Sequence, residues 1–148
     1  KYSEEECRNS LNELQWGVSI SEVEEILSNN NMKYYKSDLP VEGDNESIET
    51  IVSVDDNSYL LYFDHNECLY QVDLQVGGSR DGKFLLGMTL EEVQELLDCE
   101  LIHEPNVYAQ SQVYRTAESI EDTYFSFVFD NTEERLIIVI ESNSLKGR

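Results

Sequence analysis

Residues 85–97, LLGMTLEEVQELL, set the architecture of this chain, because residues 16–27, WGVSISEVEEIL, spell nearly the same instructions. Each stretch places a hydroxyl residue, Ser19 or Thr89, three positions before a glutamate. That spacing predicts a capping box, in which the hydroxyl and the glutamate satisfy free amides at a helix start. Both stretches are therefore predicted to begin a helix.

Apolar residues follow both caps at the helical period and predict one buried stripe on each helix. The glutamates between them fall on the opposite side of each helix and are predicted to face water. Exposed carboxylates on an amphipathic helix are a weak signal for acid/base catalysis, so no catalytic role is predicted for them. The apolar positions are Ile20, Val23, Ile26 and Leu27 in the first helix and Leu90, Val93, Leu96 and Leu97 in the second.

A second pattern recurs after each helix. Residues 59–64, YLLYFD, correspond to residues 125–130, FSFVFD, and each stretch ends in an Asp. A short polar turn and another apolar run, 68–74 or 136–140, follow that Asp. Two apolar runs joined through Asp and Asn turn residues predict a β-hairpin. Further strands are predicted near 32–36, 47–54, 101–103 and 112–116.

These patterns together predict an α+β fold of two tandem units, each a helix followed by a four-stranded antiparallel sheet, with the helices packed on one face of a combined sheet. The first unit is predicted over residues 1–76, with an extra helix at 3–14, and the second over residues 86–148. Residues 77–85 form the predicted linker, because their three glycines disfavour a helix. The two units are expected to form one compact structure.

Charge is the strongest feature of the composition. The 148 residues include 31 acidic and 10 basic side chains, a formal net charge of −21, and 40% of them are hydrophobic, enough to bury a core. A field of this sign repels phosphate backbones and anionic lipids and speeds encounter with a positively charged partner. It therefore disfavours nucleic acid and favours a basic protein partner, with plain solubility as an equally good explanation. The sequence contains no apolar run of about 18 residues, so membrane insertion through a helix is not predicted.

Catalytic and metal-binding residue types are present without the spacing that either chemistry needs. His65 and His103 have no second His or Cys at ligand spacing, and no serine lies in a Gly-x-Ser-x-Gly elbow. The odd cysteine count, Cys7, Cys68 and Cys99, argues against a disulfide scaffold and favours reduced thiols. The sequence thus predicts a non-enzymatic protein with no cofactor and no metal.

The motif Gly-Met-Thr-x-x-Glu-Val at residues 87–93, with the looser copy Gly-Val-Ser-x-x-Glu-Val at 17–23, resembles the β-lactamase-inhibitor-protein family. In that family the motif opens a short helical segment on a four-stranded antiparallel sheet, and the inhibitor itself has two such units in tandem. The resemblance implies a concave eight-stranded surface that grips another protein. The family's secreted inhibitors carry a disulfide in each unit, which three cysteines cannot reproduce, so a β-lactamase target is disfavoured.

The small size and acidic character are also similar to bacterial immunity proteins, which neutralise a cognate toxin, often a basic nuclease. The favoured hypothesis is therefore an acidic, cytoplasmic, non-enzymatic inhibitor of a basic toxin. One alternative is a secreted or envelope inhibitor or lipoprotein assembly factor, expected if a signal segment was removed before Lys1. A second alternative is a small-molecule carrier with a cavity between sheet and helices.

The residues predicted to bind the partner are tyrosines and acids. Strand alternation places Leu60 and Tyr62 on the sheet face away from the helices, with Tyr124 on the matching face of the second unit. Tyrosine is enriched at protein interfaces, and carboxylates around it would form a charged rim. The full predicted set is Tyr34, Tyr35, Leu60, Tyr62, Tyr114 and Tyr124, with Glu42, Asp44, Glu46, Asp55 and Asp56 around them.

Overall fold

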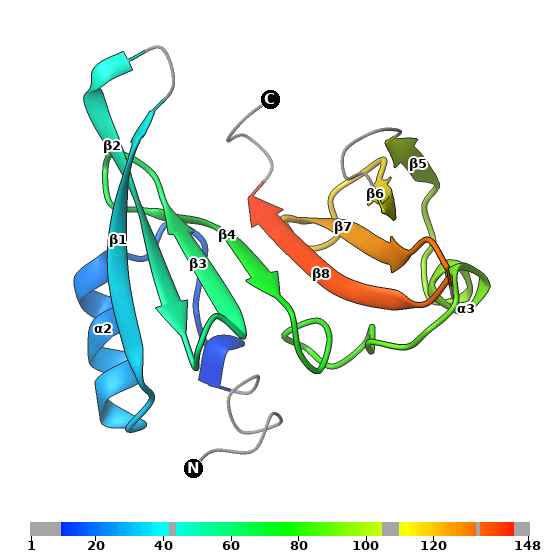
Figure 1. The fold of residues 1–148 in the computed structure, drawn as a ribbon, viewed down its shortest axis with the longest axis horizontal. Coiled ribbons are helices and arrows are strands. Elements are labelled where there is room, and N and C mark those ends of the chain that lie inside the picture. Colours follow the sequence, from blue (N-terminus) through cyan, green and yellow to red (C-terminus); the bar gives the residue numbers. More distant parts are fainter. Residues whose placement is uncertain (1–9, 42–43, 105–109, 133, 144–148) are drawn as a thin grey trace.

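A computed structural model describes residues 10–41, 44–104, 110–132 and 134–143, and describes the backbone but not the side chains at 40, 41 and 44–48. Eight strands form one antiparallel sheet in the order β1-β2-β3-β4-β8-β7-β6-β5, accompanied by two short helices (Figure 1). The elements are α2 (Ile20–Asn29), β1 (Tyr34–Val41), β2 (Asp44–Val54), β3 (Tyr59–Phe63), β4 (Leu69–Leu74), α3 (Leu90–Glu95), β5 (Leu101–Glu104), β6 (Ser111–Thr116), β7 (Thr123–Asp130) and β8 (Leu136–Asn143).

This architecture corrects the predicted fold class. β4 and β8 pair edge to edge, with Gln71–Leu74 against Val139–Ser142, so amides and carbonyls that two separate sheets would leave unpaired are satisfied. The strands therefore make one continuous sheet, and the two helices that lie wholly within the described residues are short, with ten residues in α2 and six in α3. The prediction of two helix-plus-four-strand units, with helices packed on a combined sheet, is wrong, because a single sheet dominates the structure.

The predicted strands and hairpins are confirmed. Asp64 ends the first hairpin strand, and its Oδ1 accepts hydrogen bonds from the backbone amides of Asn66 and Cys68 at 2.9 and 3.1 Å. Asp130 does the same in the second hairpin, where its Oδ1 accepts from the amide of Thr132 at 2.6 Å. An Asp that bonds the backbone two residues on is a turn-forming residue. Each hairpin is therefore closed by the residue type that predicted it.

The two helix starts dock on the sheet through the same backbone bonds. The amide of Gly17 donates to the carbonyl of Leu69 at 2.9 Å, and the amide of Leu69 donates to the carbonyl of Val18 at 3.0 Å. In the second half, the amide of Gly87 donates to the carbonyl of Leu136, and the amide of Leu136 donates to the carbonyl of Met88, both at 2.8 Å. Both glycines have positive φ, +89° and +96°, a conformation that favours glycine. The shared motif thus fixes each helix start against the first residue of β4 or β8.

The predicted capping box is complete at α3 and partial at α2. Thr89 Oγ1 accepts from the amide of Glu92 at 3.2 Å, and Glu92 Oε1 accepts from the amide of Thr89 at 2.9 Å. The bond from the Thr89 amide to the carboxylate, helped by the Thr89 side chain, holds the pKa of Glu92 below its usual value. At α2 the Ser19 hydroxyl accepts from the amide of Glu22 and donates to the Glu22 carboxylate, both at 3.2 Å. The glutamate of α2 therefore bonds the cap side chain instead of the cap amide.

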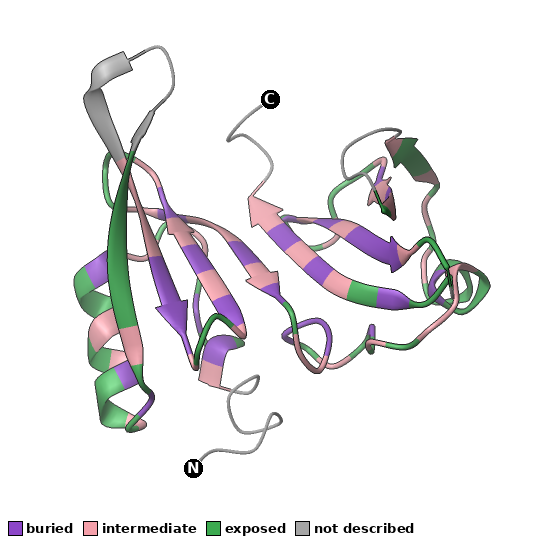
Figure 2. Ribbon diagram, viewed as in Figure 1, coloured by how far each residue is buried: buried purple, intermediate pink, exposed green. Residues whose placement is uncertain are grey.

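Two hydrophobic clusters fill the side of the sheet that carries the helices. Val23 and Leu27 of α2 belong to the first cluster, and Val93 of α3 belongs to the second, together with Phe84. The alternate strand residues predicted to pack there are confirmed, and Figure 2 shows buried and intermediate positions alternating along β3. These strand residues are Tyr59, Leu61 and Phe63 in the first cluster and Phe125, Phe127 and Phe129 in the second.

The segment predicted as a linker carries a buried ion pair. Arg80 lies between β4 and α3, and its Nε donates to Glu141 Oε1 on β8 at 2.9 Å, with side chains only 7% and 5% exposed. Its Nη1 also donates to the carbonyls of Leu11 and Leu14 at 3.2 and 3.0 Å. Arg80 therefore ties together the segment before α2, the connection after β4 and the strand that joins both halves of the sheet. The division of the chain at residues 77–85 stays a prediction.

The predicted helix at residues 3–14 is described only in part. Ser10 and Leu11 are helical and Asn12 and Glu13 form a turn, while residues 1–9 lie outside the described part of the chain.

Candidate protein-binding face

One row of side chains crosses all eight strands on the sheet face that points away from the two core clusters. Leu60 belongs to this row, because its neighbours Tyr59 and Leu61 are both fully buried in the first cluster, and successive strand residues point to opposite faces. We call this surface the helix-free face. The row contains one residue from each strand: Tyr35, Ser53, Leu60, Asp73, Ile140, Ser126, Arg115 and Ile102.

A second row runs beside the first on the helix-free face. Register places Tyr62 and Tyr124 in it, on the two sides of the β4–β8 junction. Both side chains are half-buried, so each has apolar ring surface against the sheet and part of the ring in water. The row consists of Ser37, Ile51, Tyr62, Gln71, Ser142 and Tyr124.

Asp73 is the acidic residue of the first row, and its position is fixed by the second. Tyr62 Oη donates to Asp73 Oδ2 at 3.1 Å, and Gln71 Nε2 donates to Asp73 Oδ1 at 2.9 Å. Burial raises the pKa of the Asp73 carboxyl, and these two hydrogen bonds oppose the rise. Leu60 and Ile140 flank the carboxylate on the neighbouring strands. A carboxylate framed by apolar side chains is poorly hydrated, and a cation from a partner would relieve that cost.

A strand irregularity brings Tyr70 beside Tyr62. The register of β3 and β4 shifts between Tyr62 and Phe63, and the rings of Tyr62 and Tyr70 lie 6.2 Å apart. Tyr70 Oη donates to Glu49 Oε1 at 3.0 Å. Burial and the neighbouring Glu49 carboxylate raise the pKa of Tyr70 above its usual value, so the phenol stays protonated and keeps donating. Tyr70 and Asp73 lie outside the predicted site, because neither the register shift beside Tyr70 nor the apolar neighbours of Asp73 on adjacent strands have a local sequence signal.

Four of the six predicted apolar and aromatic site residues share the helix-free face: Tyr35, Leu60, Tyr62 and Tyr124. Tyr35 is 53% exposed, and its Oη donates to Asn57 Oδ1 at 2.7 Å. The structure thus brings these four residues to one surface, spread over both halves of the sheet.

Tyr34 and Tyr114 lie on the opposite side. Tyr34 packs against the first core cluster and donates from its Oη to Glu24 Oε2 at 3.0 Å. Tyr114 packs against the second cluster, with its ring centre 5.9 Å from that of Phe129 and 4.8 Å from that of His103. Because Tyr34 and Tyr35 are adjacent on one strand, they cannot share a face.

The acids predicted to surround the tyrosines do not form a rim around them among the side chains that the structure describes. Asp55 and Asp56 occupy the turn between β2 and β3 with φ of +51° and +53°, a left-handed conformation that Asp tolerates in turns. Glu42 lies outside the described residues, and Asp44 and Glu46 lie on β2 with side chains outside the description. Among the described residues, carboxylates on or beside the helix-free face include Glu49, Asp73 and Glu104, the last paired with Arg115 at 3.2 Å, and Asp64 lies close enough to Tyr70 to help raise its pKa.

No protein-family model matches this chain, and no curated protein or solved structure shows significant similarity to it. Among the residues that the structure describes, no group of three or more His, Cys, Asp or Glu side chains could hold a metal ion. Within the same ranges, no helix is both long and apolar enough to span a membrane. The described cysteines, Cys68 and Cys99, are free thiols.

Proposed function

We propose that this chain is a non-enzymatic inhibitor that binds a basic protein through its helix-free face. The particular role that we propose is that of a bacterial immunity protein, which neutralises a basic toxin such as a nuclease. The observation that carries the proposal is the row across all eight strands, in which Leu60 and Ile140 frame the Asp73 carboxylate.

The chemistry of the face supports a protein as its ligand. Aromatic and aliphatic side chains at the centre of an interface supply most of the binding energy, and charges around them supply selectivity. Tyr62, Tyr70 and Tyr124 provide large apolar surface with few rotatable bonds. Asp73 offers a partly desolvated carboxylate at the centre, where a lysine or arginine of a partner would form a charge-assisted hydrogen bond.

The dimensions of the face also suit a protein partner. Eight strands spaced by about 4.8 Å make a surface about 34 Å wide along its curve, and six residues of a strand extend about 20 Å. This gives an area on the order of 700 Å², close to the roughly 800 Å² that each partner contributes to a standard interface. The dimensions of the whole face are therefore of the order of one side of a standard interface.

The net charge of −21 supports a basic partner. Opposite net charges raise the association rate of two proteins well above the roughly 10⁶ M⁻¹s⁻¹ that is usual for neutral pairs. The same charge would repel nucleic acid, so the chain would bind a nuclease without itself binding the nucleic acid that is the enzyme's substrate.

A matched pair of variants tests the use of the helix-free face. The partner is first identified by affinity capture from the source cell at low and high salt, and is then purified. Leu60→Glu places a charge in the central row and is expected to weaken binding by at least about tenfold. Leu85→Glu makes the same change at an exposed leucine in the connection before α3, and it is expected to leave the affinity within about twofold of the parent.

Circular dichroism and melting temperature establish that both variants are folded. Unchanged binding by the folded Leu60→Glu variant, or equal losses in both variants, would remove the helix-free face from the proposal.

A further inference from the structure

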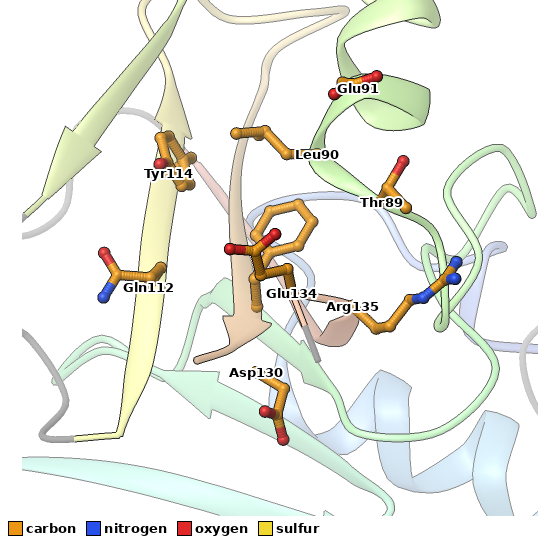
Figure 3. A pocket seen from close by; sticks show the side chains of 9 residues that line it. Thr89, Leu90, Glu91, Gln112, Tyr114, Asp130, Glu134 and Arg135 are labelled. Atoms are coloured by element: carbon orange, nitrogen blue, oxygen red, sulfur yellow. The ribbon is translucent and has the colours of Figure 1, made fainter. Parts of the chain in front are cut away.

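A groove of about 460 Å³ lies on the helix-bearing side of the sheet, between the start of α3, strands β6 and β7, and the turn that follows β7 (Figure 3). Leu90, Tyr114 and Phe129 line its apolar part. Phe129 is almost fully buried and Tyr114 is half-buried, so the rings form a supported surface. The groove is separate from the helix-free face, because these residues point into or pack against the second core cluster.

Acidic side chains border this aromatic surface. Glu91, Asp130 and Glu134 line the groove, and Figure 3 shows the Glu134 carboxylate over its middle, between Tyr114 and Arg135. Glu134 is held there by the turn between β7 and β8, where its amide donates to the carbonyl of Asp130 at 2.8 Å. The groove therefore joins a negative charge to an aromatic surface.

Arg135, the basic side chain among the described residues that line the groove, is engaged with the start of α3. Its Nη1 donates to the carbonyl of Gly87 at 3.2 Å, and its charge helps to lower the pKa of Glu92. The described lining residues carry three carboxylates and one guanidinium, so their formal net charge is −2.

We propose that this groove binds the guanidinium group of an arginine side chain presented by another protein. A guanidinium can lie against an aromatic ring while its N–H groups pair with a carboxylate, which is the combination that Tyr114 and Glu134 offer. A lysine ammonium carries the same charge but lacks the planar fork for the carboxylate. The charge complementarity of the groove selects a cation, and its aromatic part selects arginine among the cationic side chains.

The test is an NMR titration of the full chain with N-acetyl-arginine methylamide as the probe. The citrulline analogue is the matched control, because it keeps the planar shape and three N–H donors, while a carbonyl oxygen replaces one NH₂ group and the charge is lost. We expect saturable shifts of the amides of Gln112, Tyr114 and Glu134, with a Kd at least about fivefold lower for the arginine probe than for the citrulline probe. The lysine analogue is expected to bind more weakly than the arginine probe.

Two variants test whether the Glu134 carboxylate binds the arginine probe. Glu134→Gln is expected to raise the Kd for the arginine probe at least about threefold, because it removes the central carboxylate from an exposed position. Glu118→Gln alters an exposed glutamate that does not line the groove, and is expected to change the Kd less than about 1.5-fold. Equal affinity for the citrulline probe, shifts spread over acids outside the groove, or an unchanged Kd in Glu134→Gln would overturn the proposal.

The groove does not depend on the proposed function, and the two can fail separately. The Leu60→Glu variant is expected to lose the protein partner and to bind the arginine probe with the parental Kd, since Leu60 lies on the other face of the sheet.

Discussion

Replacing Glu141 with glutamine is predicted to destabilise the chain strongly, because Glu141 neutralises a buried arginine. The Glu141 carboxylate accepts from the Nε of Arg80 at 2.9 Å and from the backbone amide of Arg80 at 2.8 Å. A glutamine at this position keeps one acceptor and turns an NH₂ donor toward the other Arg80 donor. The guanidinium then stays buried without its counter-charge, at a cost of about 3–5 kcal/mol.

The loss is large beside the total stability of a domain, which is about 5–15 kcal/mol. Urea unfolding followed by circular dichroism measures the loss in the free energy of unfolding. The shift in the midpoint reports this loss if the m-value, the dependence of that free energy on urea concentration, is unchanged. Glu104→Gln is the matched control, since the pair of Glu104 with Arg115 is about a third exposed and is worth less than about 1 kcal/mol.

A double variant, Arg80→Met with Glu141→Leu, separates charge from packing. It removes the buried charge along with the pair, and it also leaves the Arg80 amide and the carbonyls of Leu11 and Leu14 without the partners that they have in the parent. A stability above that of Glu141→Gln would show that the unpaired charge costs more than these lost hydrogen bonds. A loss in Glu141→Gln no larger than the loss in Glu104→Gln would contradict the role of Glu141 as the counter-charge of the buried Arg80.

Four further substitutions probe other parts of the structure. Thr89→Ala removes the cap side chain of α3 and is expected to cost about 1 kcal/mol in urea unfolding, while the pKa of Glu92 in an NMR titration rises only in part, because the bond from the backbone amide of residue 89 is the larger cause and remains. Gly78→Ala would place a Cβ 2.0 Å from the Phe84 carbonyl oxygen and is expected to cost more than about 3 kcal/mol, whereas Gly87→Ala meets open space and costs only about 1–2 kcal/mol of backbone strain. Because burial raises the pKa of Asp73 in the folded chain, its ionisation opposes folding at neutral pH; Asp73→Asn should raise the melting temperature there, with the gain vanishing in acid below the unfolded-state pKa, where Asp73 is protonated in both states.

Local signals in the sequence predict much of this fold. The hydroxyl and glutamate at Thr89 and Glu92 predict a helix start, and the structure has the complete capping box. Asp64 and Asp130 predict hairpin turns, and both accept the turn amides. Each of these signals lies within a few residues of the structure it predicts, so no knowledge of distant partners is needed.

The pairing of distant segments could not be predicted in this way. Alternation tells which face a strand buries but not which strand lies beside it, so the junction of β4 with β8 has no counterpart in the pattern. Arg80 and Glu141 are 61 residues apart, and Arg80 stands in a glycine-rich stretch that reads as a linker. The consequence was the prediction of two units where the structure has one continuous sheet.

The candidate site was predicted by residue type more than by position. Tyr34 was grouped with Tyr35, although adjacent strand residues face opposite ways, and Tyr114 was included although it lies on the core side. Strict alternation from Tyr59, Leu61 and Phe63 would have kept Tyr35 and excluded Tyr34 once strand pairing was known. Asp73 was missed because a single acid within an apolar strand looks solvent-exposed until its neighbours Leu60 and Ile140 are placed.

The association rate of the purified partner with this chain, measured by stopped flow across a range of salt concentrations, tests the central claim most directly. An acidic inhibitor that is steered to a basic protein predicts an association rate that falls steeply as salt rises, with little change in the dissociation rate. It also predicts that Leu60→Glu acts mainly by speeding dissociation, because the central row holds the complex together. An association rate indifferent to salt, or a partner of net negative charge, would contradict the account.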